Sequence, residues 1–260
     1  MNILAEESLI EPVEPPVGSY FVTGAAGSIG GAVYDALPIV EGCDHNEEAV
    51  AKRPSVMLGD YLHFGKEANK CDYVIHAAAY KHVPLGERSE NRGSFYFNNY
   101  SKLVVLAQEV GSRMLLLSTD KAAGESYMGE TKRKAEGFVV ASGGWALRMV
   151  NVAYSKGSCL DNWEKEDVVR LVKTDCYRYF MTRQDAVNLI FATIKEKPGL
   201  YTVHGFPEVS VRELGLAYAK RAGKDIEWME LRAGEKERES LIGHGESLQN
   251  CKHPNLKRIV

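Results

Sequence analysis

The sequence predicts an α/β fold with a doubly wound parallel sheet and a smaller C-terminal substrate-binding lobe. From Ser19 onward, short apolar runs rich in β-formers alternate with helical patterns, as in βαβ units. The first of these runs leads directly into a glycine-rich loop and an amphipathic helix. A chain of 260 residues, 45% of them hydrophobic, is long enough to bury such a core. Together these features indicate a Rossmann-type fold.

The expected elements alternate along the chain. The strands of the sheet are predicted at Ser19–Thr23, Ile39–Cys43, Ser55–Leu58, Tyr73–His76, Met114–Ser118 and Trp145–Met149. The helices between them are predicted at Ile29–Leu37, Tyr61–Asn69, Asn91–Gly111 and Met128–Ala141, with Pro38 and Gly111 as stops. The looser pattern after Val150 predicts helices at Arg183–Glu196 and Val211–Ala222, and strands at Tyr177–Phe180, Leu200–Val203 and Asp225–Glu230. We therefore divide the chain into an arm (1–18), a Rossmann domain (19–150) and a substrate-binding lobe (151–260) that is interleaved with the Rossmann core.

The charge balance excludes two classes of partner. The chain has 35 acidic and 32 basic residues, so it has no basic field that could bind nucleic acid or an anionic membrane. The longest apolar stretches, near Leu103–Ala107 and Met114–Leu117, are much shorter than the roughly 20 residues of a membrane helix. The five cysteines are scattered and form no CxxC pair. We therefore expect structural thiols in a reduced, cytoplasmic compartment, and no metal site.

The segment before the first strand is predicted to be an acidic arm. It lacks the basic region and apolar core of a signal peptide. Its acidic residues and prolines are Glu6, Glu7, Glu11, Glu14, Pro12, Pro15 and Pro16. Two roles remain open for it, a flexible leader or a packing or subunit contact.

The glycine-rich loop has the spacing GxxGxxG between a strand and a helix. Gly24 permits a tight turn, Gly27 lets the backbone approach a pyrophosphate, and Gly30 allows the helix to pack closely on the sheet. The helix N-terminus then faces the anion. The pattern therefore predicts a dinucleotide site. Its loop residues are Gly24, Ala26, Gly27, Ser28, Ile29 and Gly30.

An acid follows the second predicted strand at the distance expected for a ribose partner. Asp44, with His45 beside it, would accept hydrogen bonds from the ribose diol and repel a 2′-phosphate. This favours NAD, while Lys52 and Arg53 nearby keep NADP as the alternative. Asp60, after the third strand, is placed either to contact the adenine edge or to make a turn.

Reactive side chains follow the fourth and fifth predicted strands. The fourth ends in His76-Ala-Ala-Ala-Tyr-Lys-His-Val-Pro84, and the fifth ends in Ser118-Thr-Asp-Lys121. Because the carboxyl ends of parallel strands meet at one edge of the sheet, these groups should share a ligand site. His76 and His82 could also be purely structural hydrogen-bonding residues.

These segments, in this order, resemble the UDP-N-acetylglucosamine 4,6-dehydratase family, which belongs to the extended short-chain dehydrogenases/reductases of polysaccharide biosynthesis. The resemblance runs from about Ser19 to about Ile242. The motifs that carry it are the Gly24–Gly30 loop, Asp44-His-Asn-Glu47, Ala77-Ala-Ala-Tyr-Lys-His-Val-Pro84, Ser118-Thr-Asp-Lys121, Met128-Gly-Glu-Thr-Lys132, Arg148-Met-Val-Asn-Val152, Arg178-Tyr-Phe-Met-Thr182 and Arg232-Ala-Gly-Glu-Lys236.

The resemblance implies an internal oxidation and reduction. In that family, NAD(P)+ takes a hydride from carbon 4 of the hexose, carbon 5 loses a proton, water leaves from carbon 6, and the hydride returns to carbon 6. The resemblance implies that Asp120 is the acid for the departing hydroxyl and Lys121 the base at carbon 5. A lysine is neutral enough for that task only where burial and nearby positive charge disfavour its ammonium form.

One position departs from the usual short-chain dehydrogenase pattern. The spacing Tyr-x-x-x-Lys is replaced by Met128-x-x-x-Lys132, and a thioether cannot take the proton of the 4-hydroxyl. Some family members share this methionine. Thr119 is our first choice to relay that proton, Tyr127 is the alternative, and Lys132 would bind the nicotinamide ribose.

The resemblance also implies the remaining contacts. Ala77, Ala78 and Ala79 would lie against the cofactor. Arg178 and Arg232 would clamp the diphosphate, because a guanidinium meets two phosphate oxygens at once. Glu235 would either hold that arginine loop or bind the uridine ribose. The other residues assigned to the UDP-sugar are Lys81, His82, Asn98, Asn99, Arg148 and Asn151.

Three hypotheses follow from the sequence. The first is a UDP-N-acetylglucosamine 4,6-dehydratase, with or without epimerisation at carbon 5. The second is a 4-epimerase or 4-keto reductase on the same scaffold, which would not need the adjacent Asp120 and Lys121. The third is a catalytically silent NAD(P)-binding sensor, suggested by Met128. We expect a homo-oligomer, because this superfamily pairs subunits through the helices predicted at Asn91–Gly111 and Met128–Ala141.

Overall fold

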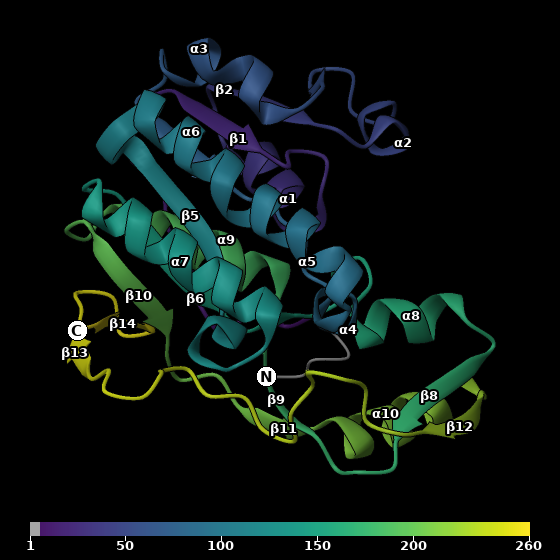
Figure 1. The fold of residues 1–260 in the computed structure, drawn as a ribbon. Coiled ribbons are helices and arrows are strands. Elements are labelled where there is room, and N and C mark those ends of the chain that lie inside the picture. Colours follow the sequence, from purple (N-terminus) through teal and green to yellow (C-terminus); the bar gives the residue numbers. More distant parts are fainter. Residues whose placement is uncertain (1–5) are drawn as a thin grey trace.

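The computed structural model describes residues 6–260 (Figure 1). Among these residues the largest sheet has nine strands, in the order β13-β14-β10-β6-β5-β4-β1-β2-β3. Its strands are β1 (Tyr20–Thr23), β2 (Val40–Asp44), β3 (Met57–Leu58), β4 (Tyr73–His76), β5 (Met114–Thr119), β6 (Trp145–Met149), β10 (Gly199–Val203), β13 (Leu248–Asn250) and β14 (Leu256–Ile259). β1 pairs in parallel with both β2 and β4, so the chain winds outward in two directions from the middle of the sheet. This confirms the predicted doubly wound parallel sheet.

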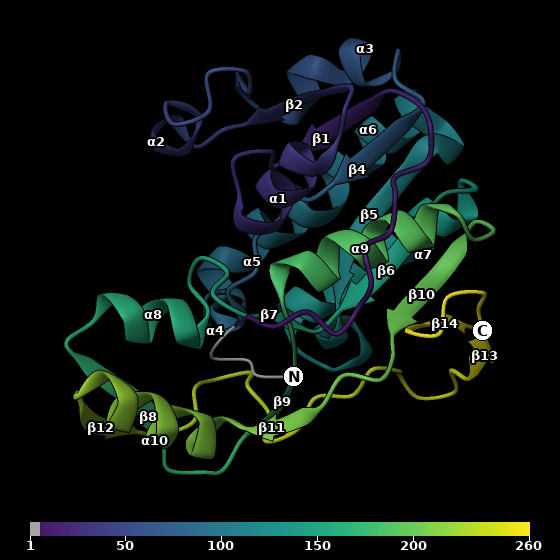
Figure 2. The ribbon, with the colours of Figure 1, turned by 180° about the vertical axis from the view of Figure 1, so that it is seen from behind.

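Helices cover both faces of this sheet. Helices α6 (Lys102–Val110) and α7 (Tyr127–Ala141) lie on the face toward the viewer in Figure 1, and α1 (Ser28–Ala36) and α9 (Arg183–Ile194) lie on the face toward the viewer in Figure 2. Each face has its own apolar core, one beneath α6 and α7 and the other beneath α1 and α9. The central strands β1, β4, β5 and β6 are buried on both sides, which is why they appear in the sequence as mainly apolar runs.

Short elements complete the Rossmann part. They are α2 (Glu47–Val50), the 3₁₀ turns η2 (Tyr61–Phe64), η4 (Gly111–Arg113) and η5 (Asp120–Ala123), α3 (Gly65–Ala68), α4 (Val83–Glu87), α5 (Ser89–Tyr96) and a π-helical turn at Phe97–Ser101. The helix predicted at Asn91–Gly111 is therefore a run of α5, the π-helical turn and α6. The helix predicted at Tyr61–Asn69 is divided between η2 and α3.

The chain after Val150 supplies two different parts of the molecule. One is a small lobe at the bottom of Figure 1, with its own core around Trp163, Leu171 and Leu214. Its elements are β7 (Asn151–Val152), α8 (Cys159–Lys165), β8 (Val168–Val172), β9 (Tyr177–Met181), β11 (Glu208–Ser210), α10 (Val211–Ala222) and β12 (Asp225–Met229). The other part is β10, β14 and β13, which extend the central sheet beyond β6. Among the strands and α-helices, the sequence did not predict α2, α4, β7, α8, β8, β11, β13 or β14.

The acidic arm packs against α9, along the face shown in Figure 2. One carboxylate oxygen of the buried Asp185 accepts hydrogen bonds from the Ser8 hydroxyl (2.7 Å) and from the backbone N–H groups of Leu9 (2.9 Å) and Ile10 (3.1 Å). Further along, the Val13 N–H donates to Asn188. Of the two roles left open by the sequence, packing is therefore correct for this stretch. The first five residues of the predicted arm lie outside the described residues.

Among residues 6–260, no helix is both long and apolar enough to cross a bilayer.

Candidate active site

The glycine loop has the tight geometry that the sequence predicts. Gly24 has a φ of +69°, and a Cβ added to it would lie 2.9 Å from the backbone nitrogen of Ala78. A Cβ on Gly30 would overlap the carbonyl oxygen of Gly24. Both positions therefore require glycine. Gly27 is the N-cap residue of α1, and the next side chain, Ser28, accepts a hydrogen bond from the backbone of Lys156 in the smaller lobe (2.8 Å).

A pocket of about 150 Å³ opens at the carboxyl ends of β1, β2 and β4. Asp44 lies in its wall, where its two carboxylate oxygens accept hydrogen bonds from the backbone of Ala26 (3.2 Å) and Asn46 (2.9 Å). These bonds orient the carboxylate at the position expected for a ribose partner. The pocket is lined by Gly24, Cys43, Asp44, His45, Gly59, Asp60, Tyr61, Ala78, Ala79, Tyr80, Asn98 and Lys102.

Lys102 is a pocket residue that the sequence did not predict. It is 8% exposed, pairs with the carboxylate of Asp60, and lies 4.5 Å from the centre of the Tyr61 ring. The hydrogen bond and charge of Lys102, with the Leu62 N–H, lower the pKa of Asp60 despite its partial burial. Asp60 is thus both the N-cap of η2 and part of the pocket wall. The only sequence feature that could have indicated Lys102 is that this lysine directly precedes the apolar run Leu103–Ala107.

Of the two cations that kept NADP open, Lys52 is exposed, whereas Arg53 pairs with an acid. The Arg53 guanidinium donates to the carboxylate of Asp35 (2.8 Å), and it lies against Gly31 on α1. His76, at the end of β4, is buried and bonded to the Thr23 hydroxyl (2.9 Å). Burial lowers the pKa of His76 to about 3, helped by the charges of Lys132 and Lys102, so this ring is a neutral structural group.

Thr119, Asp120 and Lys121 meet at the end of β5, as the sequence predicts. One oxygen of Asp120 accepts hydrogen bonds from the Thr119 hydroxyl (2.8 Å) and the Lys121 ammonium (3.0 Å). Asp120 is 1% exposed, and its second oxygen, Oδ2, has no partner among the described residues. A buried oxygen without a partner is costly, so this atom is ready to bond with a ligand hydroxyl.

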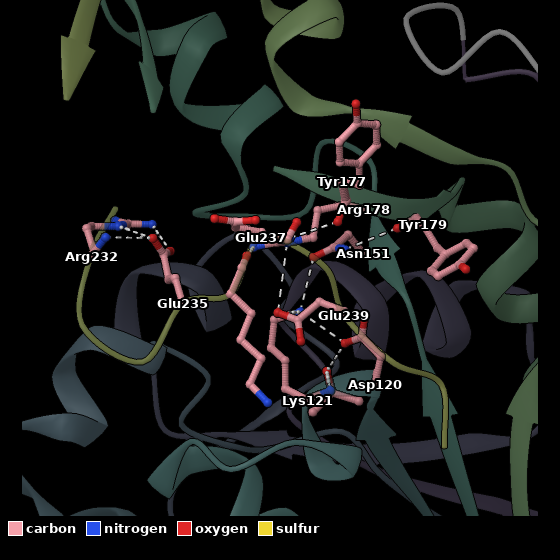
Figure 3. A network of polar contacts seen from close by, with 12 residues as sticks. Asp120, Lys121, Asn151, Tyr177, Arg178, Tyr179, Arg232, Glu235, Glu237 and Glu239 are labelled. Carbon is pink, nitrogen blue, oxygen red and sulfur yellow. Dashed lines mark hydrogen bonds and ion pairs between the residues drawn. The ribbon is translucent and has the colours of Figure 1, made fainter. Parts of the chain in front are cut away.

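Lys121 reaches from this turn toward the smaller lobe (Figure 3). Its amine lies 3.4 Å from the amide oxygen of Asn151 and 4.0 Å from a carboxylate oxygen of Glu239. The charged groups beside this amine are the carboxylates of Asp120 and Glu239, so the positive charge that would favour a neutral lysine is not among its nearest neighbours. The sequence also did not identify Glu239 as a site residue.

Lys132 and Met128 both lie on α7. The Lys132 amine is buried and donates to the carbonyl of Leu117 (2.8 Å). Burial lowers the pKa of Lys132 to about 8, and the charge of Glu136 opposes this shift. Met128 is 2% exposed and packs with Val83 and Phe95, so it is a core residue.

Tyr127, the alternative to Thr119, faces away from β5. Its ring lies 4.9 Å from the guanidinium carbon of Arg92 on α5, and its backbone N–H donates to Glu87 (2.8 Å). The Thr119 hydroxyl, in contrast, bonds directly to Asp120. The geometry therefore favours Thr119.

The residues assigned to the diphosphate come from the smaller lobe and the segment after β12. The Arg178 guanidinium donates to the backbone carbonyls of Lys236 (2.6 Å) and Glu237 (3.0 Å). Arg232 pairs with Glu235 (2.5 Å), which agrees with the first of the two roles given to Glu235. Figure 3 shows this pair to one side of Lys121. Arg232 also lines a second hollow of about 400 Å³, together with Pro84, Glu87, Arg88 and Ala233.

The loop after β4 meets the smaller lobe. The Lys81 amine donates to the carbonyl of Lys156, and the His82 ring lies beside Gly157. Partial burial, together with the charge of Lys81, lowers the pKa of His82. This contact brings the glycine loop, Lys81 and α8 to the same edge of the sheet.

No group of three or more metal-binding side chains gathers anywhere in residues 6–260.

Residues 55–260 match the family described as "Polysaccharide biosynthesis protein". The chain belongs to this family. The match covers more than half of the chain and confirms the family that the sequence motifs predict.

Two curated relatives are equally distant in sequence from this chain. It is 28% identical over 226 residues to an uncharacterized membrane protein of Methanocaldococcus jannaschii, covering 74% of this chain and 68% of the relative. It is 28% identical over 194 residues to the UDP-N-acetylglucosamine 4,6-dehydratase (inverting) of Campylobacter jejuni, covering 68% of this chain. The aligned region spans 58% of the Campylobacter enzyme, little more than half its length.

A solved structure with the same fold is the UDP-glucose 4-epimerase of Thermus thermophilus in complex with NAD. The TM-score is 0.74, the identity is 20%, and the superposition covers 86% of this chain and 90% of that structure. At this identity the likeness establishes the fold.

In this polysaccharide biosynthesis protein Arg148 is not at the ligand edge, contrary to our expectation. It is 1% exposed inside the protein, bonded to both oxygens of Glu136 on α7 (3.1 Å each to Nε) and of Glu246 (2.6 and 2.9 Å). The Ser118 hydroxyl also donates to Glu136. The two carboxylates occupy the guanidinium, which leaves Arg148 no free side for a sugar nucleotide.

Asn99 is also an internal residue of this family member. It is 1% exposed, and its amide bonds to the backbone N–H and C=O of Tyr80 (2.8 and 2.9 Å) and to the Thr131 hydroxyl (3.1 Å). Asn99 thus fixes the loop that carries Ala78 and Ala79, whereas its neighbour Asn98 lines the pocket. Asn151 lies between Lys121 and the backbone of Tyr179 (3.1 Å).

Proposed function

We propose that this chain is a nucleotide-sugar 4,6-dehydratase that converts UDP-N-acetylglucosamine to a UDP-4-keto-6-deoxy-hexose with tightly bound NAD. The observation that carries the proposal is the cluster at the end of β5, where Thr119, the unpaired oxygen of Asp120 and Lys121 lie together. A proton donor and an amine next to each other suit an elimination of water, which needs both an acid and a base. The Campylobacter jejuni relative, itself a UDP-N-acetylglucosamine 4,6-dehydratase, supports the same reaction.

The glycine loop and its pocket fit a dinucleotide. Gly24 makes the tight turn and Gly30 allows α1 to pack closely on the loop, so Gly27, at the N-cap of α1, would let the backbone approach a diphosphate. Asp44 would hold the adenosine ribose. Lys132, buried beside β5, would hold the nicotinamide ribose. When bound, the dinucleotide would supply a reversible hydride acceptor.

The chain's own residues would carry the proton transfers. Thr119 would relay the proton of the 4-hydroxyl, since Met128 is packed in the core and Tyr127 faces α5. Asp120 would protonate the departing hydroxyl from its free oxygen. Lys121 would take the proton from carbon 5.

The choice of NAD gives a testable variant. Asp44→Arg should shift the ratio of NADP to NAD affinity about tenfold or more toward NADP, because it replaces a carboxylate by a phosphate-binding guanidinium. Titration of the cofactor-free protein with each dinucleotide measures this ratio. Glu41→Arg is the matched control, since Glu41 lies on the same strand but is exposed. An unchanged preference in Asp44→Arg would mean that Asp44 does not contact the ribose.

An isotope experiment tests the reaction itself. UDP-N-acetylglucosamine deuterated at carbon 4 should give a product with deuterium in its new methyl group, without added reductant. In heavy water, one solvent deuterium should appear at carbon 5. Mass spectrometry and NMR of the product detect both labels. A 4-epimerase would return the deuterium to carbon 4, a reductase would consume added NAD(P)H, and a sensor would move neither label, so each of these outcomes rejects the dehydratase.

A further inference from the structure

The segment after β12 forms hydrogen bonds with β9 before it reaches the end of β5. The Arg178 guanidinium binds the carbonyls of Lys236 and Glu237, and the Tyr177 N–H also donates to the Glu237 carbonyl (2.7 Å). Two residues later, the side chain of Glu239 points back toward Lys121 (Figure 3). The backbone bonds therefore place this carboxylate in the candidate site.

Glu239 lies between two cations. One of its oxygens is 4.0 Å from the Lys121 amine and 3.9 Å from Nε of Arg178, and its side chain is 8% exposed. On the other side of Lys121, Asp120 is 3.0 Å away. Further out, the Lys236 amine lies beside Gly124 at the end of η5. Asp120, Lys121, Glu239 and Arg178 thus alternate in sign, and without Glu239 this partly buried group would carry an unbalanced positive charge.

We propose that Glu239 is a positioning residue of the candidate site, which orients the Lys121 amine and stabilises its ammonium form. Its kinetic consequence rests on the proposed function. When Lys121 takes the proton of carbon 5, the C–H bond breaks, an N–H bond forms, and the electron pair stays on the sugar as an enolate. The neutral amine becomes an ammonium, and Glu239 stabilises that product of the transfer. The carboxylate therefore lies where it can stabilise the positive charge that forms on Lys121 during the transfer.

The test compares Glu239→Gln, which removes the charge at nearly constant shape, with the native chain. The Lys121 amine is acetylated with trace acetic anhydride at a fixed pH of about 8, in the absence of substrate. Peptide mass spectrometry gives the rate of acetylation. We expect Lys121 to be labelled about three- to tenfold faster in Glu239→Gln, because more of its amine is neutral. Lys236, on the same segment, is the internal reference and should keep its rate.

Two further variants separate charge from packing. Glu237→Gln is the matched control, because Glu237 is exposed and joins this network through its backbone carbonyl. Glu239→Asp keeps the charge, so it should leave the Lys121 rate close to native. In the dehydratase assay, Glu239→Gln should lower kcat about tenfold with KM within about twofold of native.

Equal acetylation rates of Lys121 in the native chain and in Glu239→Gln would overturn the proposal. So would a parallel rise at Lys236, which would mean that the whole segment has loosened. If the native chain makes no 4-keto product, the proposed function fails, but the labelling rates still decide the role of Glu239.

Discussion

Replacing Asp120 by asparagine should lower turnover of UDP-N-acetylglucosamine by roughly 10²–10⁴-fold while KM changes little. The amide keeps the shape of the carboxyl group, and its oxygen can still accept from Thr119 and Lys121. What it loses is the proton that a carboxylic acid would give to the departing hydroxyl. The large effect is expected because the free oxygen of Asp120 is buried, so solvent is poorly placed to replace it as the acid.

Steady-state formation of the 4-keto product measures the Asp120→Asn effect. Asp225→Asn serves as the control, because Asp225 is exposed on β12, far from β5 in the fold. A near-native kcat for Asp120→Asn would assign the acid to another group. A large rise in KM with native kcat would show that Asp120 only binds the substrate.

Arg148→Met should destabilise the protein by about 3–5 kcal/mol, a large part of the stability of a typical domain. The methionine fills a similar volume but leaves the carboxylates of Glu136 and Glu246 facing each other without a cation. Glu136 is 2% exposed, so water cannot replace the guanidinium there. Hydrogen bonds from Arg148 and from the Gly243 N–H lower the pKa of Glu246 even though partial burial raises it, which is consistent with a strong pairing.

Urea unfolding, followed by far-UV circular dichroism, measures the loss. The chain offers a matched control in Arg170, which also bonds to two carboxylates, Glu166 and Glu227, but on the surface at 45% exposure. Arg170→Met should cost less than about 1 kcal/mol. Similar losses for the two variants would mean that burial does not determine the strength of the Arg148 cluster.

Much of the fold could be predicted because buried parallel strands have a strong local signal. β1, β4, β5 and β6 consist mainly of buried apolar residues, and their boundaries differ by a residue at most from the predicted ones. β13 and β14 have no such signal. β13 is exposed throughout, and β14 has adjacent Lys257 and Arg258 between two apolar residues. They are strands because β14 pairs with β10 and β13 pairs with β14.

The candidate site also contains some residues whose positions could be predicted from the sequence and others whose positions could not. Gly24, Asp44 and the Thr119–Lys121 turn each lie at the carboxyl end of a strand, so their positions could be predicted from the local sequence. The roles of Lys102 and Glu239 could not be predicted locally, because their partners Asp60 and Lys121 are distant in the sequence. Arg148 was misplaced for a related reason. It stands near the end of β6, beside Ser118 of β5, but its side chain meets Glu136 on α7 rather than the ligand edge.

The contact between the arm and Asp185 affects the order in which the protein can fold on the ribosome. The backbone of Ile10 bonds to a residue 175 positions later in the chain. Synthesis proceeds at about 5–20 residues per second, so roughly ten seconds or more pass between the synthesis of the arm and that of its acceptor. During that time β1, β2 and β4 can already pair and Tyr20 of β1 can bond to Pro16, whereas Ser8, Leu9 and Ile10 still lack their acceptor. Docking of the arm is therefore a late event, and protection of the Ile10 amide from hydrogen exchange would report that α9 has formed and is in place.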